Sequence, residues 1–335
     1  MQSVKYSRDN AGQSLKKYIL LKQGELAYNH GASKAKQFGC CYELTEPEAR
    51  IPYVYHCFKV SDTEYTPFVA ATLNNPKMDK QLKRLVSSSV RMDGLLNISF
   101  DDYMSVSLHL PSFAEQEKIA DFLKKLDERI TAQETLVASL KKYKRGVSTY
   151  LFDSNCSHPK SSPIWSKVRI NDIASIFIGE FVIKTKQSPS APYPVYNGGT
   201  SFTGLYDDYN QEGNRVLVSA RGANAGFVNK VNGKCWIGNS CYAISLFENA
   251  PIFFDYLYHY LKFNQGKLIE SQQSANIPSI SKKQLQDFNV EFPDLNAQQE
   301  IVQFLNCLDA KINYEEKKFS AFGSLRLGLL QQLFI

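Results

Sequence analysis

Two carboxylates and a lysine in the last part of the sequence have the spacing of a metal-dependent nuclease. Pro293-Asp294 is followed by Asp309-Ala310-Lys311, a PD…DxK pattern in which carboxylates hold Mg²⁺ and a lysine lies near the attacking water. Metal ligands must converge on one point, but Asp309 and Lys311 flank apolar positions of a long helical pattern. The pattern is therefore more typical of a helix surface, and a nuclease stays as an alternative function.

Other signals for catalysis are absent from the sequence. It has no GxxxxGKS/T, HExxH or GxSxG motif, and no acidic-Pro-Pro-aromatic sequence of an amino-methyltransferase. Its five histidines and seven cysteines have no metal-ligand spacing. Signals for catalysis, a metal or a cofactor are therefore scarce in this sequence.

The composition is that of a globular chain. Its 335 residues are 43% apolar, which favours about two domains with a core each. A net charge of +6 permits nucleic-acid binding but does not require it. No apolar run approaches the ~18 residues of a membrane helix, no signal peptide is recognisable, and the odd number of cysteines is typical of reduced thiols. We therefore expect a cytoplasmic protein.

The sequence contains an internal repeat with an offset of 182 residues. Leu110 to Ile119 aligns without a gap with Phe292 to Ile301, and the match continues through Leu126-Asp127 and Leu308-Asp309. The register holds over about 55 residues, which is longer than chance similarity usually extends. We interpret it as a duplicated structural unit.

Each copy of the repeat carries a heptad pattern of apolar residues. The pattern predicts a helix of ~33 residues and ~50 Å in each copy. Both patterns are interrupted at equivalent polar positions, first Gln133 and Glu315 and then Lys144 and Arg326. Because a polar seam residue fixes register, we predict that the two helices pair with each other as an antiparallel coiled coil. The predicted interface residues are Ile119, Leu123, Leu126, Ile130, Val137 and Leu140 in the first copy and Ile301, Leu305, Leu308, Ile312, Phe319 and Phe322 in the second.

The segments before the two helices are rich in Tyr, Phe, Gly and Asn. Runs such as Arg215 to Ser219 and Tyr242 to Leu246 predict strands, Asn197-Gly198 and Asn232-Gly233 predict turns, and Phe253 to Phe263 predicts a helix. The predicted fold class is therefore α+β, with two mixed α/β domains separated by two long, paired helices.

Side chains suited to DNA contact are concentrated in loops of these domains. Arginine pairs well with guanine edges and asparagine with adenine, whereas lysine and tyrosine usually contact the backbone. The candidates are Asn29, His30, Lys34 and Lys36 in the first domain and Lys184, Lys186, Tyr196, Asn197, Thr200, Ser201, Arg221 and Asn239 in the second. Two such domains held apart by a helix pair would read two half-sites at a fixed distance.

On these residues the chain resembles the DNA specificity subunit of type I restriction-modification systems. Leu110-Pro111 through Leu126-Asp127 is similar to the start of that family's spacer helix, and Phe292-Pro293 through Leu308-Asp309 is similar to its second copy. Trp165 to Ala174 resembles the opening of a target recognition domain, and Tyr193 to Gly199 and Cys235 to Asn239 continue the match.

The resemblance implies a non-catalytic, DNA-binding subunit of a host-defence complex that methylates DNA. Each target recognition domain would read one half of a bipartite target, and the helices would dock two modification (methyltransferase) subunits. S-adenosylmethionine would belong to the methyltransferase, and ATP with Mg²⁺ to a restriction (motor-nuclease) subunit. The domains would be a first target recognition domain at 1–110, spacer helix 1 at 111–152, a linker at 153–164, a second target recognition domain at 165–292 and spacer helix 2 at 293–335.

The first domain departs from the family pattern. Trp165 opens the second domain, and the repeat offset places the matching point before residue 1. We therefore expect the first domain to be shortened at its N-terminus. This gives a second alternative function, a truncated or silent subunit that acts mainly as a coiled-coil assembly adaptor.

Overall fold

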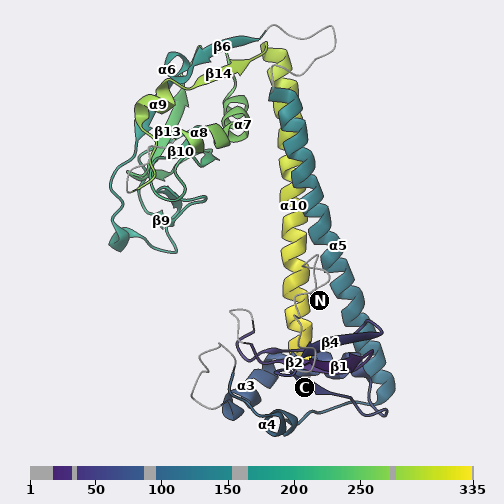
Figure 1. Ribbon diagram of the computed structural model, residues 1–335. Helices are drawn as coiled ribbons and strands as arrows, with labels where there is room; N and C mark the ends of the chain where they lie inside the picture. Colours follow the sequence, from purple (N-terminus) through teal and green to yellow (C-terminus); the bar gives the residue numbers. More distant parts are fainter. Residues whose placement is uncertain (1–17, 32–35, 87–95, 153–164, 272–276, 334–335) are drawn as a thin grey trace. The chain divides into compact units, whose positions relative to one another are not determined.

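The computed structural model describes residues 18–31, 36–86, 96–152, 165–271 and 277–333 (Figure 1). The chain divides into two compact units, residues 1–135 with 316–335 and residues 136–315. Each unit contains one globule and a segment of each long helix. Within the described ranges, no helix combines the length and apolar character that a membrane crossing requires. The predicted linker at 153–164 lies outside these ranges.

The second unit is built on a four-stranded antiparallel sheet. Its elements before the last long helix are β6 (Ser166–Arg169), α6 (Ile170–Ile173), β7 (Ala174–Ile178), η2 (Lys184–Lys186), β8 (Tyr193–Tyr196), β9 (Gly204–Tyr206), β10 (Arg215–Ser219), β11 (Val228–Val231), β12 (Trp236–Ile237), β13 (Cys241–Leu246), α7 (Phe254–Phe263), α8 (Gln265–Glu270), α9 (Lys282–Gln286) and β14 (Asn289–Phe292). The main sheet has the order β11-β10-β13-β7, a second sheet has the order β12-β8-β9, and β14 pairs with β6. The run Val216-Leu217-Val218 of β10 is buried throughout, as expected for a central strand covered on both faces.

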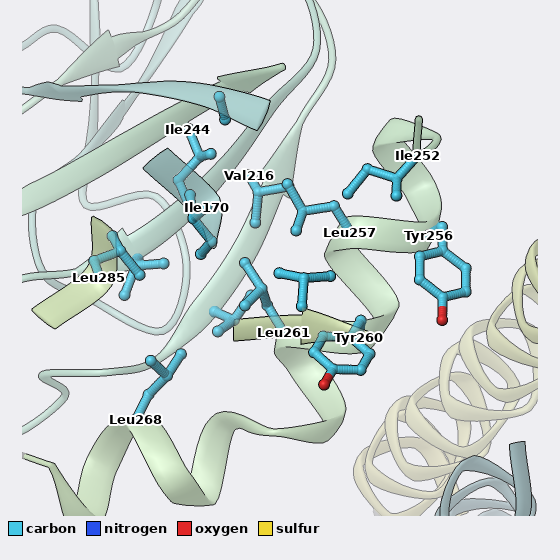
Figure 2. Packing of buried hydrophobic residues seen from close by; sticks show 14 of the residues in the cluster. Ile170, Val216, Ile244, Ile252, Tyr256, Leu257, Tyr260, Leu261, Leu268 and Leu285 are labelled. Carbon is cyan, nitrogen blue, oxygen red and sulfur yellow. The ribbon is translucent and has the colours of Figure 1, made fainter. Parts of the chain in front are cut away.

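One hydrophobic cluster of the second unit joins the sheet, α7 and the long helices. Val216 of the sheet and Leu257 of α7 belong to this cluster (Figure 2). Tyr256 and Tyr260 lie on its side next to the long helices, where Phe152 packs edge-on against both rings at 5.7 Å between centroids. Because these side chains share one core, α7 and the sheet are expected to move as one body.

The first unit has a smaller sheet. Its elements are β1 (Tyr18–Lys22), β2 (Leu26–Asn29), β3 (Cys40–Glu43), β4 (Glu48–Pro52), β5 (His56–Phe58), α2 (Thr66–Leu73), α3 (Pro76–Leu85) and α4 (Phe100–Met104). Strands β3-β2-β5 form an antiparallel sheet, and β1 pairs with β4. In both units a serine caps the short helix before the long one, Ser99 at α4 and Ser281 at α9. These serines are 182 residues apart, so the repeat extends into the globules.

The two long helices begin and end close to the predicted positions. They are α5 (Phe113–Phe152) and α10 (Leu295–Leu333). Within each unit, the segments of α5 and α10 lie side by side and run in opposite directions (Figure 1). Every predicted seam residue from Ile119 to Phe322 is buried or half-buried. The predicted fold class, α+β with an antiparallel pair of long helices, is confirmed.

Polar interruptions of the two seams form equivalent ion pairs. In the second unit Lys144 pairs with Asp309, and in the first unit Arg326 pairs with Asp127. The repeat offset relates the two pairs, because Lys144 corresponds to Arg326 and Asp309 to Asp127. Arg326 is held twice, since its Nη2 also donates to Asp127 Oδ2 at 3.0 Å. Each pair is made in one alignment of the helices only, so the interruptions fix the register.

Two buried glutamines, also related by the repeat, attach each globule to its long helix. Gln116 Oε1 accepts from Tyr65 N at 2.9 Å, and Gln298 Oε1 accepts from Phe253 N at 3.1 Å. Tyr65 and Phe253 are the N-cap residues of α2 and α7. Each glutamine therefore satisfies a backbone N–H group at the start of the corresponding helix of its globule.

We expect reversal of one seam ion pair to be tolerated only when both partners are exchanged. Lys144→Glu would place two carboxylates together in a half-buried seam, so the free energy of unfolding should fall by about 1–3 kcal/mol. Combining it with Asp309→Lys restores opposite charges and should recover most of the loss. Denaturant unfolding of the two single variants and the double variant measures this coupling. Purely additive losses would contradict a role in register.

Candidate nucleic-acid interface

Three strand ends of the second unit meet at one edge of its globule. β12 runs parallel to β8, so both strands end side by side, and Gly238 N donates to Tyr196 O at 2.8 Å. β10 is antiparallel to β13, which brings Ala220 next to Ser240, and Ala220 N donates to Ser240 O at 2.8 Å. The loops that follow β8, β10 and β12 are therefore adjacent, on a sheet scaffold suited to a binding site.

Side chains of this edge hold the loops in place. Asn197 Oδ1 accepts from Ser240 N at 3.0 Å. Asn229 Nδ2 donates to Thr200 O at 3.1 Å, so the loop is tied to β11 as well. Asn197, predicted to read a base, thus uses its carbonyl oxygen to position the neighbouring turn.

A glycine is required where two of these loops approach. A Cβ atom on Gly238 would lie 2.3 Å from Asn197 Oδ1, so any side chain would displace Asn197 from the turn that it holds. Gly238 belongs to the site but was missed by sequence reasoning, which selected its neighbour Asn239. The only available signal was the Gly-Asn pair, which is typical of turns in general.

The exposed groups at this edge suit DNA contact. The loop edge, as we call it, consists of the predicted residues Tyr196, Asn197, Thr200, Ser201, Arg221 and Asn239. Arg221, Thr200 and Ser201 are exposed, and the others are half-buried. The backbone of Arg221 forms a bridge with Ser279, so its guanidinium extends from a fixed position. Burial raises the pKa of Tyr196, which keeps its hydroxyl neutral.

The two remaining predicted residues of this globule lie on η2. Lys184 and Lys186 are both exposed. The residue before them is anchored by Tyr206, whose hydroxyl donates to Ile183 O at 2.7 Å and accepts from Ile183 N at 2.5 Å. Two exposed lysines on an anchored turn are typical of contacts to phosphate rather than to bases.

The predicted residues of the first globule make more contacts within the protein. Asn29 Oδ1 accepts from Gly31 N at 2.9 Å, at the end of β2. Lys36 is half-buried, and its Nζ donates to Asn74 O at 2.9 Å. Lys34 lies outside the described residues. Among the described candidates, this globule therefore has no counterpart of the exposed Arg221.

His30 is buried, which corrects the prediction that it contacts DNA. His30 is only 3% exposed. Its Nδ1 lies 3.0 Å from the carbonyl oxygen of Leu96, and its Nε2 lies 2.6 Å from the carbonyl oxygen of Val54. Buried ring nitrogens require polar partners, and here the partners come from two distant segments. His30 therefore ties β2 to the turn between β4 and β5.

In each globule an exposed aromatic side chain lies near the predicted DNA-contacting residues, and neither was predicted. Phe202 directly follows Ser201 of the loop edge, and Tyr53 lies in the turn between β4 and β5; both are exposed. Aromatic rings on DNA-binding loops can contact thymine methyl groups or stack on bases. Such residues resemble core residues in sequence, so exposure alone identifies them.

The residues of the nuclease pattern have structural roles. Asp294 Oδ1 accepts two backbone N–H bonds at the start of α10, at 2.9 and 3.0 Å. Asp309 pairs with Lys144, and Lys311 pairs with Glu315 at 2.8 Å. The two aspartates are separated by about four helical turns. The described ranges contain no group of three or more side chains able to hold a metal ion, so the nuclease interpretation is not supported.

The side-chain amine of Lys262 in α7 has a lowered pKa. Its Nζ donates to Val228 O at 2.8 Å and to Gln265 Oε1 at 2.9 Å, and lies 3.7 Å from the centre of the Phe227 ring. Burial lowers the pKa of Lys262 from 10.5 to about 8, and the charge of Lys144 acts in the same direction. The folded chain therefore releases this proton at lower pH than the unfolded chain does.

Through Lys262, the free energy of unfolding should rise as pH increases from about 8 to about 10.5. In this window the unfolded chain binds more protons than the folded chain, so the slope of stability against pH is positive. Lys262→Met should remove that rise while other titrating groups remain. Denaturant unfolding of both proteins at several pH values measures the difference, and identical slopes would contradict the lowered pKa.

Comparison with known proteins finds a family model that matches part of this chain and relatives of low sequence identity. Residues 164–320 match the family model described as the type I restriction modification DNA specificity domain. A protein of Mycoplasma genitalium, described as a type I specificity subunit, is 23% identical over 246 residues, which cover 71% of this chain and 64% of the relative. A Methanocaldococcus jannaschii protein, described as the specificity subunit of a type I restriction enzyme, is 26% identical over 238 residues, which cover 64% of this chain and 55% of the relative. The chain thus spans less than two thirds of either relative.

Solved structures share the fold. The crystal structure of a type I restriction-modification S subunit from Mycoplasma genitalium matches with a TM-score of 0.67 and 18% identity, over 98% of this chain and 86% of the other. A chain from a structure on assembly and conformational transition of a type I restriction-modification system matches with a TM-score of 0.58 and 17% identity, over 96% and 84%. At this identity, the likeness concerns the fold.

Proposed function

We propose that this chain, whose residues 164–320 match the type I restriction modification DNA specificity domain, is a sequence-specific DNA-binding subunit of that family. It reads a bipartite target through its two globules and directs methyltransferase subunits, and restriction subunits where present, to that target. The loop edge is the observation that carries the proposal. It places the exposed Arg221 among polar side chains on a rigid sheet scaffold.

The proposed subunit acts through binding, and its partners carry the chemistry. S-adenosylmethionine would bind to the methyltransferase subunit, and ATP with Mg²⁺ to a restriction subunit. The side chains that a nuclease would need, Asp294, Asp309 and Lys311, are engaged in a helix cap and in two ion pairs, which supports a subunit that acts by binding. We place the assembly in the cytoplasm, where chromosomal DNA is accessible.

Equivalent apolar side chains on the long helices favour two copies of one partner. Phe122 of the first unit is 50% exposed, and Phe304 of the second unit is 44% exposed. These residues are related by the repeat offset, as are the exposed Tyr143 and Leu325. Large exposed apolar side chains are typical of protein interfaces. We therefore assign one modification subunit to each unit, with Phe122 and Phe304 at the two contacts.

The first globule favours a second candidate function, an assembly adaptor that reads DNA poorly. His30 is buried, and both Asn29 and Lys36 bond within the protein. An adaptor would still bind modification subunits through its helices. The two candidates differ in DNA selectivity and not in assembly.

Selection of duplexes from a random library tests the proposal. The full chain is co-expressed with its methyltransferase subunit, and the purified complex is incubated with the library at near-physiological salt, because phosphate attraction at low salt is non-specific. The selected duplexes should share two sequence blocks at a fixed spacing, bound about 10³-fold or more above random DNA. An adaptor that reads DNA poorly would give a stable complex that selects one block only or none.

A further inference from the structure

A polar network around a buried histidine connects α7 of the second globule to both long helices. His259 is 2% exposed, and its Nε2 lies 2.9 Å from Asn306 Oδ1. Its Nδ1 lies 4.0 Å from Asp309 Oδ2, and Asp309 pairs with Lys144. The network therefore joins α7, α10 and α5 within the second unit.

The ring of His259 is held neutral. Burial lowers its pKa, and the positive charge of Lys144 acts in the same direction, against the bond to Asn306 and the charge of Asp309. A neutral ring can donate from Nε2 to Asn306, while Lys144 balances the charge of Asp309. Such a bond is directional, so it is satisfied in one orientation of α7 on α10.

The network is not required by the duplicated fold. Counted from the equivalent N-cap residues Tyr65 and Phe253, Ala71 takes the place of His259 in the first unit. Ala71 packs against an apolar cluster that contains Phe68. The same fold is therefore completed there without a histidine, so completion of the core does not require one at this position.

A different bond attaches the first globule to α10. Asn75 Nδ2 donates to Leu330 O at 2.8 Å in the first unit. The bond from Asn75 ends on a backbone carbonyl, whereas the bond from His259 ends on the side chain of Asn306. The two globules thus have separate polar attachments, and each attachment can be altered without the other.

We propose that His259 is a positioning residue that fixes the second globule on the helix pair and so sets the gap between the two DNA half-sites. α7 shares its core with the sheet, so a rotation of α7 would carry the loop edge with it. A small rotation at the helix pair changes which groove position the loops reach. The inference rests on the proposed function, because a gap exists only if both globules read DNA.

Duplexes that differ only in gap length test this role. Methylation by the complex of the full chain with its methyltransferase subunit is measured on targets whose gap is native, one base pair shorter or one base pair longer. His259→Leu and Asn306→Ala each remove the bond between the two side chains. Each should lower the preference for the native gap about tenfold, because the loss of one net hydrogen bond changes an equilibrium constant by about that factor. Base preferences within each half-site should stay as in the unmodified protein.

Two further variants serve as matched controls. His259→Gln keeps an N–H donor at similar reach and should keep the native gap preference. Lys167→Gln breaks the ion pair of Lys167 with Glu291, which links β6 to β14 and not to α7 or the long helices, and should leave the gap preference unchanged.

The outcomes distinguish failure of the proposed function from failure of the positioning role of His259. Failure of the unmodified complex to methylate any bipartite target would overturn the proposed function. A native gap preference that persists in both His259→Leu and Asn306→Ala would overturn the positioning role alone. Asn306 is half-buried, so Asn306→Ala decides the question if His259→Leu fails to fold.

Discussion

Arg221→Ala is expected to relax recognition at one position of one half-site and to leave the other half-site unchanged. Arg221 is exposed at the loop edge, and the bridge of its backbone with Ser279 fixes where its guanidinium begins. A bidentate contact of arginine with guanine discriminates by ~1–3 kcal/mol, so selectivity at that position should fall about 5- to 150-fold. Binding to random duplex should change much less, because it depends on phosphate contacts.

Competition binding with all single-base variants of the target measures this effect. Arg169→Ala is a matched control, because Arg169 is an exposed arginine of the same globule and pairs with Asp172 at 3.2 Å. It should leave both half-sites unchanged. A uniform loss of affinity for all sequences in Arg221→Ala would assign Arg221 to phosphate and would contradict base reading.

Phe122→Ser and Phe304→Ser should each reduce the complex from two modification subunits to one. Both residues are large apolar side chains that stand about half exposed at equivalent positions of the repeat. Loss of a central aromatic side chain costs an interface ~2–4 kcal/mol, which weakens binding about 30- to 1000-fold. The double variant should therefore bind no modification subunit at concentrations where the unmodified chain binds two.

Native mass spectrometry of the co-expressed complexes reports the number of subunits directly. Asp121→Ser and Gln303→Ser are matched controls, because these exposed polar residues precede Phe122 and Phe304 on the same helices. Both controls should retain two partners. Two partners retained in Phe122→Ser and in Phe304→Ser would place the docking surface elsewhere.

The long helices could be predicted because their signal is local and repeated. A heptad pattern is read from residues three and four positions apart, and the repeat doubles the evidence for it. The polar interruptions predicted that the two seams match. The sequence could not specify the pairing itself, in which Lys144 contacts Asp309 and Arg326 contacts Asp127, because this depends on the axial register of one helix against the other.

The site could be predicted only in part because it depends on contacts between distant segments. Arg221 and Thr200 were selected for their chemistry, and strand order brings their loops together. His30 was selected on the same grounds but is buried. The carbonyl oxygens of Leu96 and Val54 lie next to its ring nitrogens, and no local sequence pattern predicts these contacts. Gly238 was missed for the same reason, since its close approach to Asn197 exists only in the folded chain.

The nuclease pattern shows how spacing can mislead. Asp294, Asp309 and Lys311 satisfy a known order of residue types, but a continuous helix keeps the two aspartates about four turns apart. Convergence of side chains, and not their order in the sequence, makes a metal site. The helical periodicity of the same segment was the more reliable signal.

The DNA specificity of this chain can be measured by mapping methylated bases in DNA from cells that co-express it with its methyltransferase subunit. We expect one bipartite motif with two defined halves and a fixed gap, and loss of that motif when the chain is omitted. Methylation confined to a single half-site, or no sequence-specific methylation despite a stable complex, would contradict the claim that both globules read DNA.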